Sequence, residues 1–456
     1  MKGLTPGVIA ELTGGEYVGV ASSRGVRVAG AVRDHRDVKP GNLFVCVRGA
    51  HVDGHDFAGS AFDLGAACCL AERAIPNAKG PYVLVGSTLD SIKTIGAYHR
   101  RLFDIPVIGI TGSVGKTTTK DMVAAALGAR FNVLKTTGNL NNELGVPLTL
   151  LSLDERHEAA VIEMGISDFG EMGRLAEMVR PDIFIITKIG YSHIKELGDL
   201  NGVLRAKTEA FAYMGPGGTA VLNGDDDLLR GYDPGMRKIT FGLENHNDYR
   251  AESVRAEGAD ALTCDIFSST GRHAIRVPAF GNHLAGAALA AAVIGDIAGL
   301  TGEELRRGLS SYAPVEGRAN VIVTGYITII DDCYNANPNS VKSALESLSV
   351  LPGRRVAILG DMLNLGEHSD KMHRETGACA ASNSIDSLIC SGENSLMICE
   401  GYLSAGGTAA SHFKTNKELI AALPELIEQD DIVLVKASNS MRFNEIVQRL
   451  REPGLC

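Results

Sequence analysis

The segment Gly109–Lys120 has the residue types and spacing of a phosphate-binding loop. It reads GITGSVGKTTTK and lies between a β-branched run, Pro106–Thr111, and a predicted helix, Thr118–Leu127. Glycines let backbone N–H groups turn toward phosphate oxygens, and the helix that follows adds the positive end of its dipole. The segment therefore predicts that ATP is bound by Thr111, Gly112, Ser113, Val114, Gly115, Lys116, Thr117 and Thr118.

Two side chains of this loop have predicted chemical roles. Lys116 is expected to reach the β- and γ-phosphates, and the Thr117 hydroxyl is expected to ligate Mg²⁺. The strict GxxxxGK[ST] template asks for glycine at position 110, where this chain has Ile110. A glycine-rich turn with a solvent-exposed lysine is the alternative interpretation, and the order strand, loop, helix disfavours it.

Further polar residues stand close to the predicted strand ends. Glu163 ends the run Ala159–Glu163, where a carboxylate can bind Mg²⁺ beside the phosphate loop. Asn139, Asn141 and Asn142 cluster in a turn. Amides both donate and accept hydrogen bonds, which suits a sugar or a pyrophosphate, although turn propensity alone also explains asparagines here.

Strand-like runs alternate with helical stretches, which predicts an α/β protein with largely parallel sheets. We expect three domains: a small mixed α/β domain at 1–85, a central parallel-sheet ATPase domain at 86–314, and a Rossmann-like domain at 315–456. Short alternating segments over 240–280 predict an antiparallel extension of the central sheet. Strand candidates include 43–47, 82–85, 106–111, 159–163, 182–187, 219–222, 327–331, 356–360, 387–390 and 432–436.

Composition narrows the class of protein. The 456 residues are 45% hydrophobic and 21% charged, which is typical of a folded soluble chain and excludes an intrinsically disordered one. The net charge of −10 argues against a protein that binds nucleic acid through its overall charge. The most apolar segment, Leu284–Gly295, is too short to span a bilayer and predicts a buried helix. With no signal-peptide pattern, we expect a cytoplasmic monomer without membrane insertion.

Beyond the loop TGSVGKTTT, several segments resemble the Mur ligase family, the ATP-dependent amide ligases of peptidoglycan precursor assembly. The resemblance covers nearly the whole chain. The segment YNANP, Tyr334–Pro338, is similar to the branch that adds D-alanyl-D-alanine, and the DNPR-type motif of the branch that adds the third amino acid is absent. The other matching segments are Val38–Phe44, Asp53–Phe57, Thr136–Leu150, Glu163–Met172, Ile186–Gly198, Ala206–Phe211 and Asp331–Ser340.

The resemblance implies an activity and its cofactors. D-alanyl-D-alanine would be joined to UDP-N-acetylmuramoyl-tripeptide through an acyl phosphate, with ATP consumed and two Mg²⁺ ions bound. Lys116, His193 and Lys207 would be the catalytic residues. Thr117, Glu163, His193 and a carbamylated Lys207 would hold the metal, because carbamylation converts the lysine into a carboxylate-like ligand.

The resemblance also assigns the binding residues. Asn139, Asn141 and Asn142 would hold the muramoyl substrate, with Asp34 and Arg36 at its uridine diphosphate end. ATP would meet His283, Arg318, Asp332, Asn335 and Asn337, and Lys436 with Ser438 would face the dipeptide or the phosphates. The chain departs from the family near the adenine, where Leu284 and Ala287 stand in place of the usual amides.

Three alternatives remain open from the sequence. A folylpolyglutamate-type or another Mur-type ligase shares the chemistry, although the former lacks a domain equivalent to residues 1–85. A simple P-loop kinase or ATPase leaves the segments NLNNELGVP and DDCYNANP unexplained. A non-catalytic homologue would keep the fold, but retention of Lys116, Glu163 and Lys207 argues against it.

Overall fold

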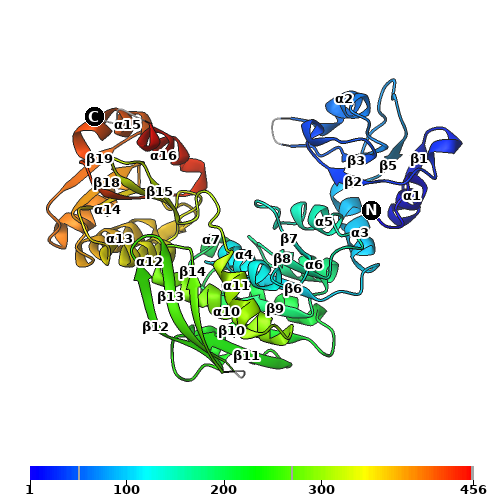
Figure 1. Cartoon of the computed structure of the whole chain (residues 1–456). Helices are drawn as coiled ribbons and strands as arrows, with labels where there is room; N and C mark the ends of the chain where they lie inside the picture. Colours follow the sequence, from blue (N-terminus) through cyan, green and yellow to red (C-terminus); the bar gives the residue numbers. More distant parts are fainter. Residues whose placement is uncertain (50–51, 269–270, 453–456) are drawn as a thin grey trace.

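The computed structural model describes residues 1–49, 52–268 and 271–452, and these residues form three lobes, each built on its own sheet (Figure 1). The N-terminal and C-terminal lobes lie at opposite ends of the central one (Figure 1). The sheets contain five, nine and six strands in the described ranges. This arrangement confirms the predicted three-domain α/β fold.

The N-terminal lobe is a small mixed sheet, as predicted. Its strand order is β1-β5-β4-β3-β2, in which only the β1–β5 pair is antiparallel. Helix α3 leads from this lobe into the central one. The elements are α1 (Pro6–Thr13), β1 (Glu16–Val18), β2 (Gly30–Val32), β3 (Asn42–Val45), α2 (Ala58–Asp63), β4 (Cys68–Ala71), β5 (Tyr82–Leu84) and α3 (Thr88–Arg100).

The central lobe has the order β14-β13-β12-β11-β10-β9-β6-β8-β7. Strands β6 to β12 pair in parallel, and β13 and β14 add the expected antiparallel extension. The strands are β6 (Val107–Thr111), β7 (Val133–Lys135), β8 (Ala159–Glu163), β9 (Ile183–Ile186), β10 (Thr219–Asn223), β11 (Arg237–Gly242), β12 (Tyr249–Glu257), β13 (Ala261–Ser268) and β14 (Gly271–Val277). The helices are α4 (Lys116–Leu127), α5 (Gly145–Leu150), α6 (Glu171–Val179), α7 (Ile194–Leu197), α8 (Leu200–Thr208), α9 (Asp227–Gly231), α10 (Ala285–Ile297) and α11 (Gly302–Ser310).

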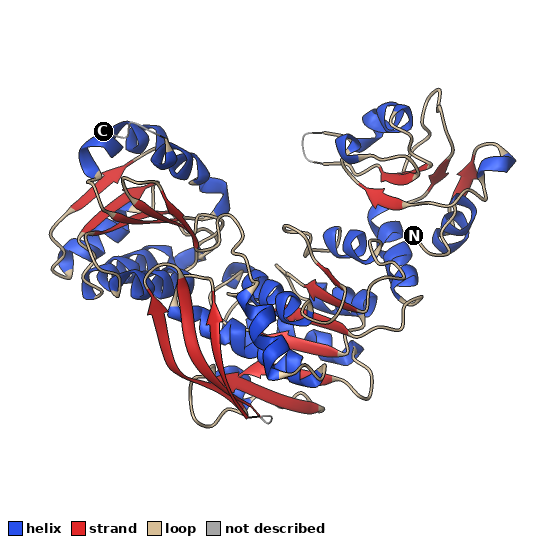
Figure 2. Ribbon diagram, viewed as in Figure 1, coloured by secondary structure: helices blue, strands red, loops and turns tan. Residues whose placement is uncertain are grey.

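Helix α10 is the buried helix that the alanine-rich segment predicts. Nearly all of its residues are buried, and it packs against α4, which carries the phosphate loop at its N-terminus. Figure 2 shows helices covering the parallel strands of the central sheet. Small alanine side chains let two helices approach closely, so α10 supports α4 from behind. In the described part of the chain, no helix is both long and apolar enough to cross a membrane.

The C-terminal lobe is a parallel sheet with one antiparallel edge, in the order β15-β16-β20-β17-β18-β19. The half-buried edge strands β15 and β19 were not expected from the sequence, because they lack continuous apolar runs. The elements are β15 (Asn320–Val323), β16 (Thr328–Asp331), α12 (Pro338–Ser349), β17 (Arg355–Gly360), α13 (Ser369–Ser382), β18 (Ser387–Ser391), α14 (Leu396–Ser404), β19 (Ala410–Phe413), α15 (Asn416–Leu426), β20 (Ile432–Lys436) and α16 (Asn444–Arg451).

His99 ties three segments together at the junction of the N-terminal and central lobes. Its ring is fully buried on α3, where Nδ1 lies 3.0 Å from the Leu150 carbonyl oxygen and Nε2 accepts the Lys2 backbone N–H at 3.1 Å. A ring that donates on one side and accepts on the other is neutral. Burial is the main cause that lowers its pKa in the folded protein.

This clamp predicts a pH dependence of stability. Below pH 6.5 His99 becomes protonated in the unfolded chain, whereas in the folded chain it stays neutral to lower pH. The free energy of unfolding should therefore decrease as the pH falls from 7 toward 5. The variant His99→Gln should flatten this dependence, as measured by urea unfolding at several pH values. Identical slopes in the two proteins would show that His99 does not carry the effect.

Candidate active site

The phosphate loop connects β6 to α4 at the carboxyl edge of the central sheet. Gly112 has φ +151° and Gly115 has φ +84°, conformations that favour glycine. The Thr187 hydroxyl, just after β9, donates to the Val114 carbonyl at 2.5 Å. A Cβ at Gly112 would lie 1.9 Å from that hydroxyl oxygen. The loop therefore needs glycine at position 112 because a neighbouring strand supports it from below.

Ser113 anchors the loop through hydrogen bonds within the protein. Its backbone N–H donates to the Lys188 carbonyl at 2.8 Å, and its hydroxyl exchanges hydrogen bonds with the backbone of Gly190 at 2.9 and 3.0 Å. The sequence predicted that Ser113 binds ATP directly. Since its donors are engaged within the protein, we assign it to holding the loop's shape.

Two lysines, one buried and one half-buried, lie beside the loop. Lys207, on α8, is 3% exposed and has no hydrogen bond or ion pair with any described residue. Burial, followed by the charge of Lys116, lowers the pKa of Lys207 well below its ordinary value. Burial also lowers the pKa of Lys116, which donates to the Gly112 carbonyl at 2.8 Å. A neutral amine is the form that adds to CO₂, so this environment fits carbamylation of Lys207.

Glu163 ends β8 with one oxygen hydrogen-bonded and the other free of hydrogen bonds. The residue is 1% exposed. Its Oε1 accepts the Asn141 side-chain amide at 2.8 Å, and its backbone N–H donates to the Thr136 hydroxyl at 2.9 Å. Oε2 is buried without a hydrogen-bond partner. Buried oxygens are nearly always satisfied, and carboxylate oxygens are preferred ligands of Mg²⁺, so Oε2 fits a metal ion.

His193 precedes α7 in the left-handed conformation, with φ +55°. Burial, then the charges of Lys207 and Lys116, lowers its pKa, so the ring is neutral near pH 7 and has a lone pair to offer. No group of three or more His, Cys, Asp or Glu side chains within the described ranges could hold a metal ion. A metal set here would thus combine Glu163 and His193 with the Thr117 hydroxyl, a modified Lys207 and phosphate oxygens.

The three asparagines of the predicted substrate turn have different environments. Asn141 orients Glu163, as described above. Asn142 caps α5 by accepting the backbone N–H groups of Leu144 and Gly145 at 3.2 and 2.9 Å. Asn139 is exposed, and its side chain has no hydrogen bond with the residues described. Asn139 therefore has its whole amide free to meet a substrate, and the exposed Asn142 has its amide nitrogen free, among the residues described.

The C-terminal candidates gather where β16 and β20 end. The Lys436 ammonium is 2.6 Å from Asp332 Oδ2 and 3.0 Å from the Asn335 carbonyl oxygen. The Ser438 hydroxyl accepts the Leu363 N–H at 2.9 Å, and the Asn337 side chain caps α12. These contacts bring the predicted residues together, but they engage Lys436 within the protein.

Arg318 is a charged group of the C-terminal lobe without a described ion-pair partner. Its guanidinium lies 3.9 Å from the centre of the Tyr334 ring, and it forms no ion pair with any described carboxylate. Its charge contributes to lowering the Lys116 pKa, so the two cations lie within electrostatic range of each other across the two lobes.

The predicted adenine region contains one buried polar atom, on Asn282, that was not expected from the sequence. His283 Nδ1 lies 3.1 Å from the Ser347 hydroxyl, which links the central lobe to α12. Leu284 and Ala287 are buried and offer no polar group. Asn282 was not singled out from the sequence, yet its Oδ1 is buried without a hydrogen-bond partner. The signal that could have identified Asn282 is its side-chain amide, which directly precedes His283 in the sequence.

Asp34 and Arg36 lie in the N-terminal lobe, which Figure 1 shows apart from the phosphate loop. They pair with each other at 2.5 Å, and Asp34 also accepts the Arg36 backbone N–H at 3.0 Å. The ring of His35 between them stacks on Phe57 at 4.3 Å. The pair is thus part of an ordered turn, and the structure does not bring it to the other candidates.

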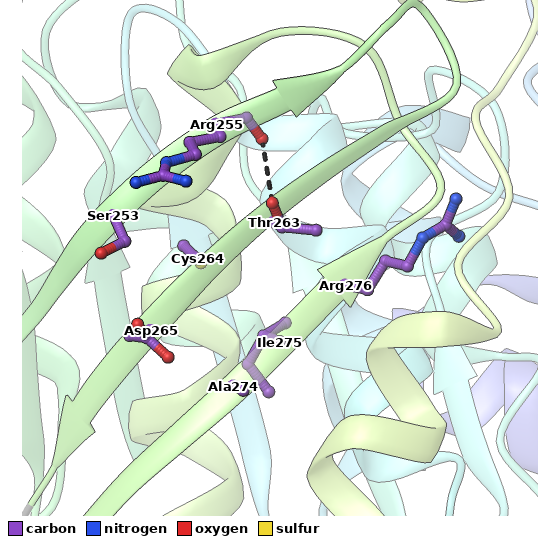
Figure 3. Close-up of a pocket in the computed structure, with 8 residues that line it drawn as sticks. All are labelled: Ser253, Arg255, Thr263, Cys264, Asp265, Ala274, Ile275 and Arg276. Carbon is purple, nitrogen blue, oxygen red and sulfur yellow. Dashed lines mark hydrogen bonds between the residues drawn. The ribbon is translucent and has the colours of Figure 1, made fainter.

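A cavity of about 400 Å³ lies on the antiparallel extension, away from the parallel strand ends (Figure 3). None of the residues that line it belongs to the predicted site. They are Ser253, Arg255, Thr263, Cys264, Asp265, Ala274, Ile275 and Arg276. The candidate active site is therefore the strand-end cluster around the phosphate loop.

Comparison with known families agrees with this fold. Residues 33–92 match the Mur ligase family catalytic domain, 110–295 the Mur ligase middle domain, and 317–439 the Mur ligase glutamate ligase domain. The chain therefore belongs to the Mur ligase family. A relative from Bacillus subtilis (strain 168), named UDP-N-acetylmuramoyl-tripeptide–D-alanyl-D-alanine ligase, is 36% identical over 94% of each chain.

Solved structures give the same result. The chain is similar to MurF from Acinetobacter baumannii, with 29% identity and a TM-score of 0.87 over 98% of this chain and 99% of that one. It is also similar to MurF ligase from Thermotoga maritima in complex with ADP, with 27% identity and a TM-score of 0.82 over 93% and 97%.

The close approach at the loop predicts the effect of Gly112→Ala. The added methyl would collide with the Thr187 hydroxyl, so the loop must shift and its affinity for nucleotide should fall by about tenfold or more. Titration calorimetry with ADP and Mg²⁺ measures the change. Thr187→Ser, which keeps the hydroxyl, should bind as the wild type does. Unchanged affinity in Gly112→Ala would contradict the predicted clash.

Proposed function

We propose that this protein is an ATP-dependent ligase that joins D-alanyl-D-alanine to UDP-N-acetylmuramoyl-tripeptide, with release of ADP and phosphate. One observation carries the proposal: half-buried Lys116, buried Lys207 and a buried carboxylate oxygen of Glu163 lie at or near a phosphate loop. The named activity of the 36%-identical relative supports the choice of substrates.

The reaction begins when the tripeptide carboxylate attacks the γ-phosphate of ATP, which forms an acyl phosphate and ADP. Lys116, held over the loop by the Gly112 carbonyl, neutralises charge on the transferring group. The amine of D-alanyl-D-alanine then attacks the acyl carbon, and the tetrahedral intermediate expels phosphate. Arg318 lies within electrostatic range of Lys116, so its guanidinium stabilises charge on the phosphates from the C-terminal lobe.

Mg²⁺, when bound, supplies Lewis-acid stabilisation of the phosphates. Glu163 Oε2, the neutral His193 ring, the Thr117 hydroxyl and a carbamylated Lys207 would hold it. Carbamylation would convert a buried, unpaired amine into an anionic ligand. We propose two ions, as the resemblance to the family implies.

The three lobes divide the binding work in this proposal. Residues 1–85 take the uridine diphosphate end of the precursor, 86–314 bind ATP and the muramoyl group, and 315–456 receive the dipeptide. Asn139 and the turn that contains Asp34 are the contacts proposed for the precursor. Movement of the C-terminal lobe onto the central one then excludes water from the acyl phosphate.

A folylpolyglutamate-type ligase is the strongest alternative in the same chemical class. The match of residues 33–92 to a Mur ligase domain favours the muramoyl substrate over a folate. A non-catalytic homologue is the alternative from another class. The buried Glu163 and Lys207, which are costly to keep without a function, weigh against it.

Phosphate release from ATP tests the function. Release should require both UDP-N-acetylmuramoyl-tripeptide and D-alanyl-D-alanine, and omission of either should reduce it to background. Folate with glutamate serves as the competing substrate pair. Release with the folate pair, or no release with any pair, would overturn the proposal.

The role of Lys207 has a separate test. Lys207→Ala should reduce ligase activity by about a hundredfold or more, since it removes a metal ligand. Short carboxylic acids such as formate or acetate should restore part of that activity by occupying the space of the carbamate. Restoration should saturate with acid concentration and be absent in Glu163→Ala. A Lys207→Ala protein with normal activity would exclude this role.

A further inference from the structure

A second lysine of the phosphate-loop helix, Lys120, lies one turn beyond Lys116 and faces the protein interior. It is 2% exposed, so its ammonium is held out of water. Such burial is costly unless opposite charges lie nearby. The carboxylates that face it are Glu163, with Oε2 at 4.0 Å, and Asp121, with Oδ1 at 3.5 Å.

Asp121 has a second lysine within ion-pair distance, whereas Glu163 has no second one among the described residues. Lys135, at the end of β7, places its ammonium 2.7 Å from Asp121 Oδ1. In the described ranges, Lys120 is the one cation within ion-pair distance of Glu163. Lys120 therefore compensates the Glu163 carboxylate, while Lys135 compensates Asp121.

The separation of 4.0 Å has a chemical consequence. It exceeds hydrogen-bond length, so the ammonium attracts Glu163 Oε2 without occupying its lone pairs. Asn141 binds the other oxygen at 2.8 Å. One carboxylate oxygen is thus fixed by a hydrogen bond, and the other is held electrostatically but remains free to accept a ligand.

We propose that Lys120 is a positioning residue for the proposed ligase reaction: its buried ammonium holds the Glu163 carboxylate in place and serves as its counter-ion until Mg²⁺ binds. The inference rests on the proposed function for the metal, and on the ion-pair geometry for the role of Lys120. Lys120 itself touches no substrate in this scheme.

A double-mutant cycle on the metal-free full-length protein tests the pair. Lys120→Met should destabilise the wild type more than it destabilises Glu163→Gln, with a coupling of about tenfold or more in the unfolding equilibrium constant. Urea unfolding measures all four proteins. Lys135→Met is the matched control, since it removes a cation from Asp121 but not from Glu163, and its effect should add to that of Glu163→Gln.

The outcomes separate the pair from a packing role. Additive effects of Lys120→Met and Glu163→Gln would overturn the proposal, because the loss of a lysine that only packs destabilises the protein equally with or without the charge of Glu163. If Lys120→Met alone does not fold, folding of the Lys120→Met/Glu163→Gln protein supports the proposal. Failure of both to fold overturns it.

Magnesium supplies an independent readout. Millimolar MgCl₂ without nucleotide should raise the unfolding midpoint of Lys120→Met more than that of the wild type, because the ion replaces the missing cation at Glu163. The extra shift should vanish in Lys120→Met/Glu163→Gln. Equal shifts would overturn the assignment of Mg²⁺ to Glu163, whereas a coupled unfolding cycle would still support the ion pair.

Discussion

Burial of positive charge beside the phosphate loop is the constraint on which the active site depends. Lys116 and Lys120 lie on α4 and Lys207 lies on α8; Glu163 pairs with Lys120 and acts electrostatically on Lys116, whereas Lys207 has no described carboxylate partner. Isolated buried charges are unstable, so each cation must be paired, neutralised or matched by an anionic ligand. Lys120 is paired with Glu163, the pKa of Lys207 is lowered, and Lys116 is the lysine that we propose to bind phosphate.

The same constraint explains the surrounding scaffold. The loop that positions Lys116 must be rigid, because in a mobile loop the ammonium would turn outward into solvent. Thr187, just after β9, donates to the loop at Val114, Ser113 bonds across to Gly190, and the alanine-rich α10 packs against α4. The chain has a net charge of −10, so anionic substrates must be attracted by these local cations and not by the overall field.

The sequence predicted the fold and the strand-end location of the site well, because the alternating strands and the loop motif are local patterns. It was less informative about what each side chain contacts. The contacts of Asn141 with substrate and of Ser113 with ATP stay predictions; what the sequence did not indicate is that the Asn141 amide holds Glu163 and that Ser113 anchors the loop. These partners lie between 22 and 77 residues apart in sequence. Local patterns do not encode such pairings, and Lys120 was missed for the same reason.

The C-terminal lobe follows a different principle from the phosphate loop. Its buried lysine, Lys436, is paired with Asp332 inside the lobe, and Asn337 caps α12 within the lobe as well. Because these contacts are internal, they persist whatever the distance between the lobes. The group that lacks an internal carboxylate among the described residues is Arg318, which is held against Tyr334 and lies within electrostatic range of Lys116. In the reaction proposed above, the charge that the C-terminal lobe would bring toward the phosphates on closing is therefore that of Arg318.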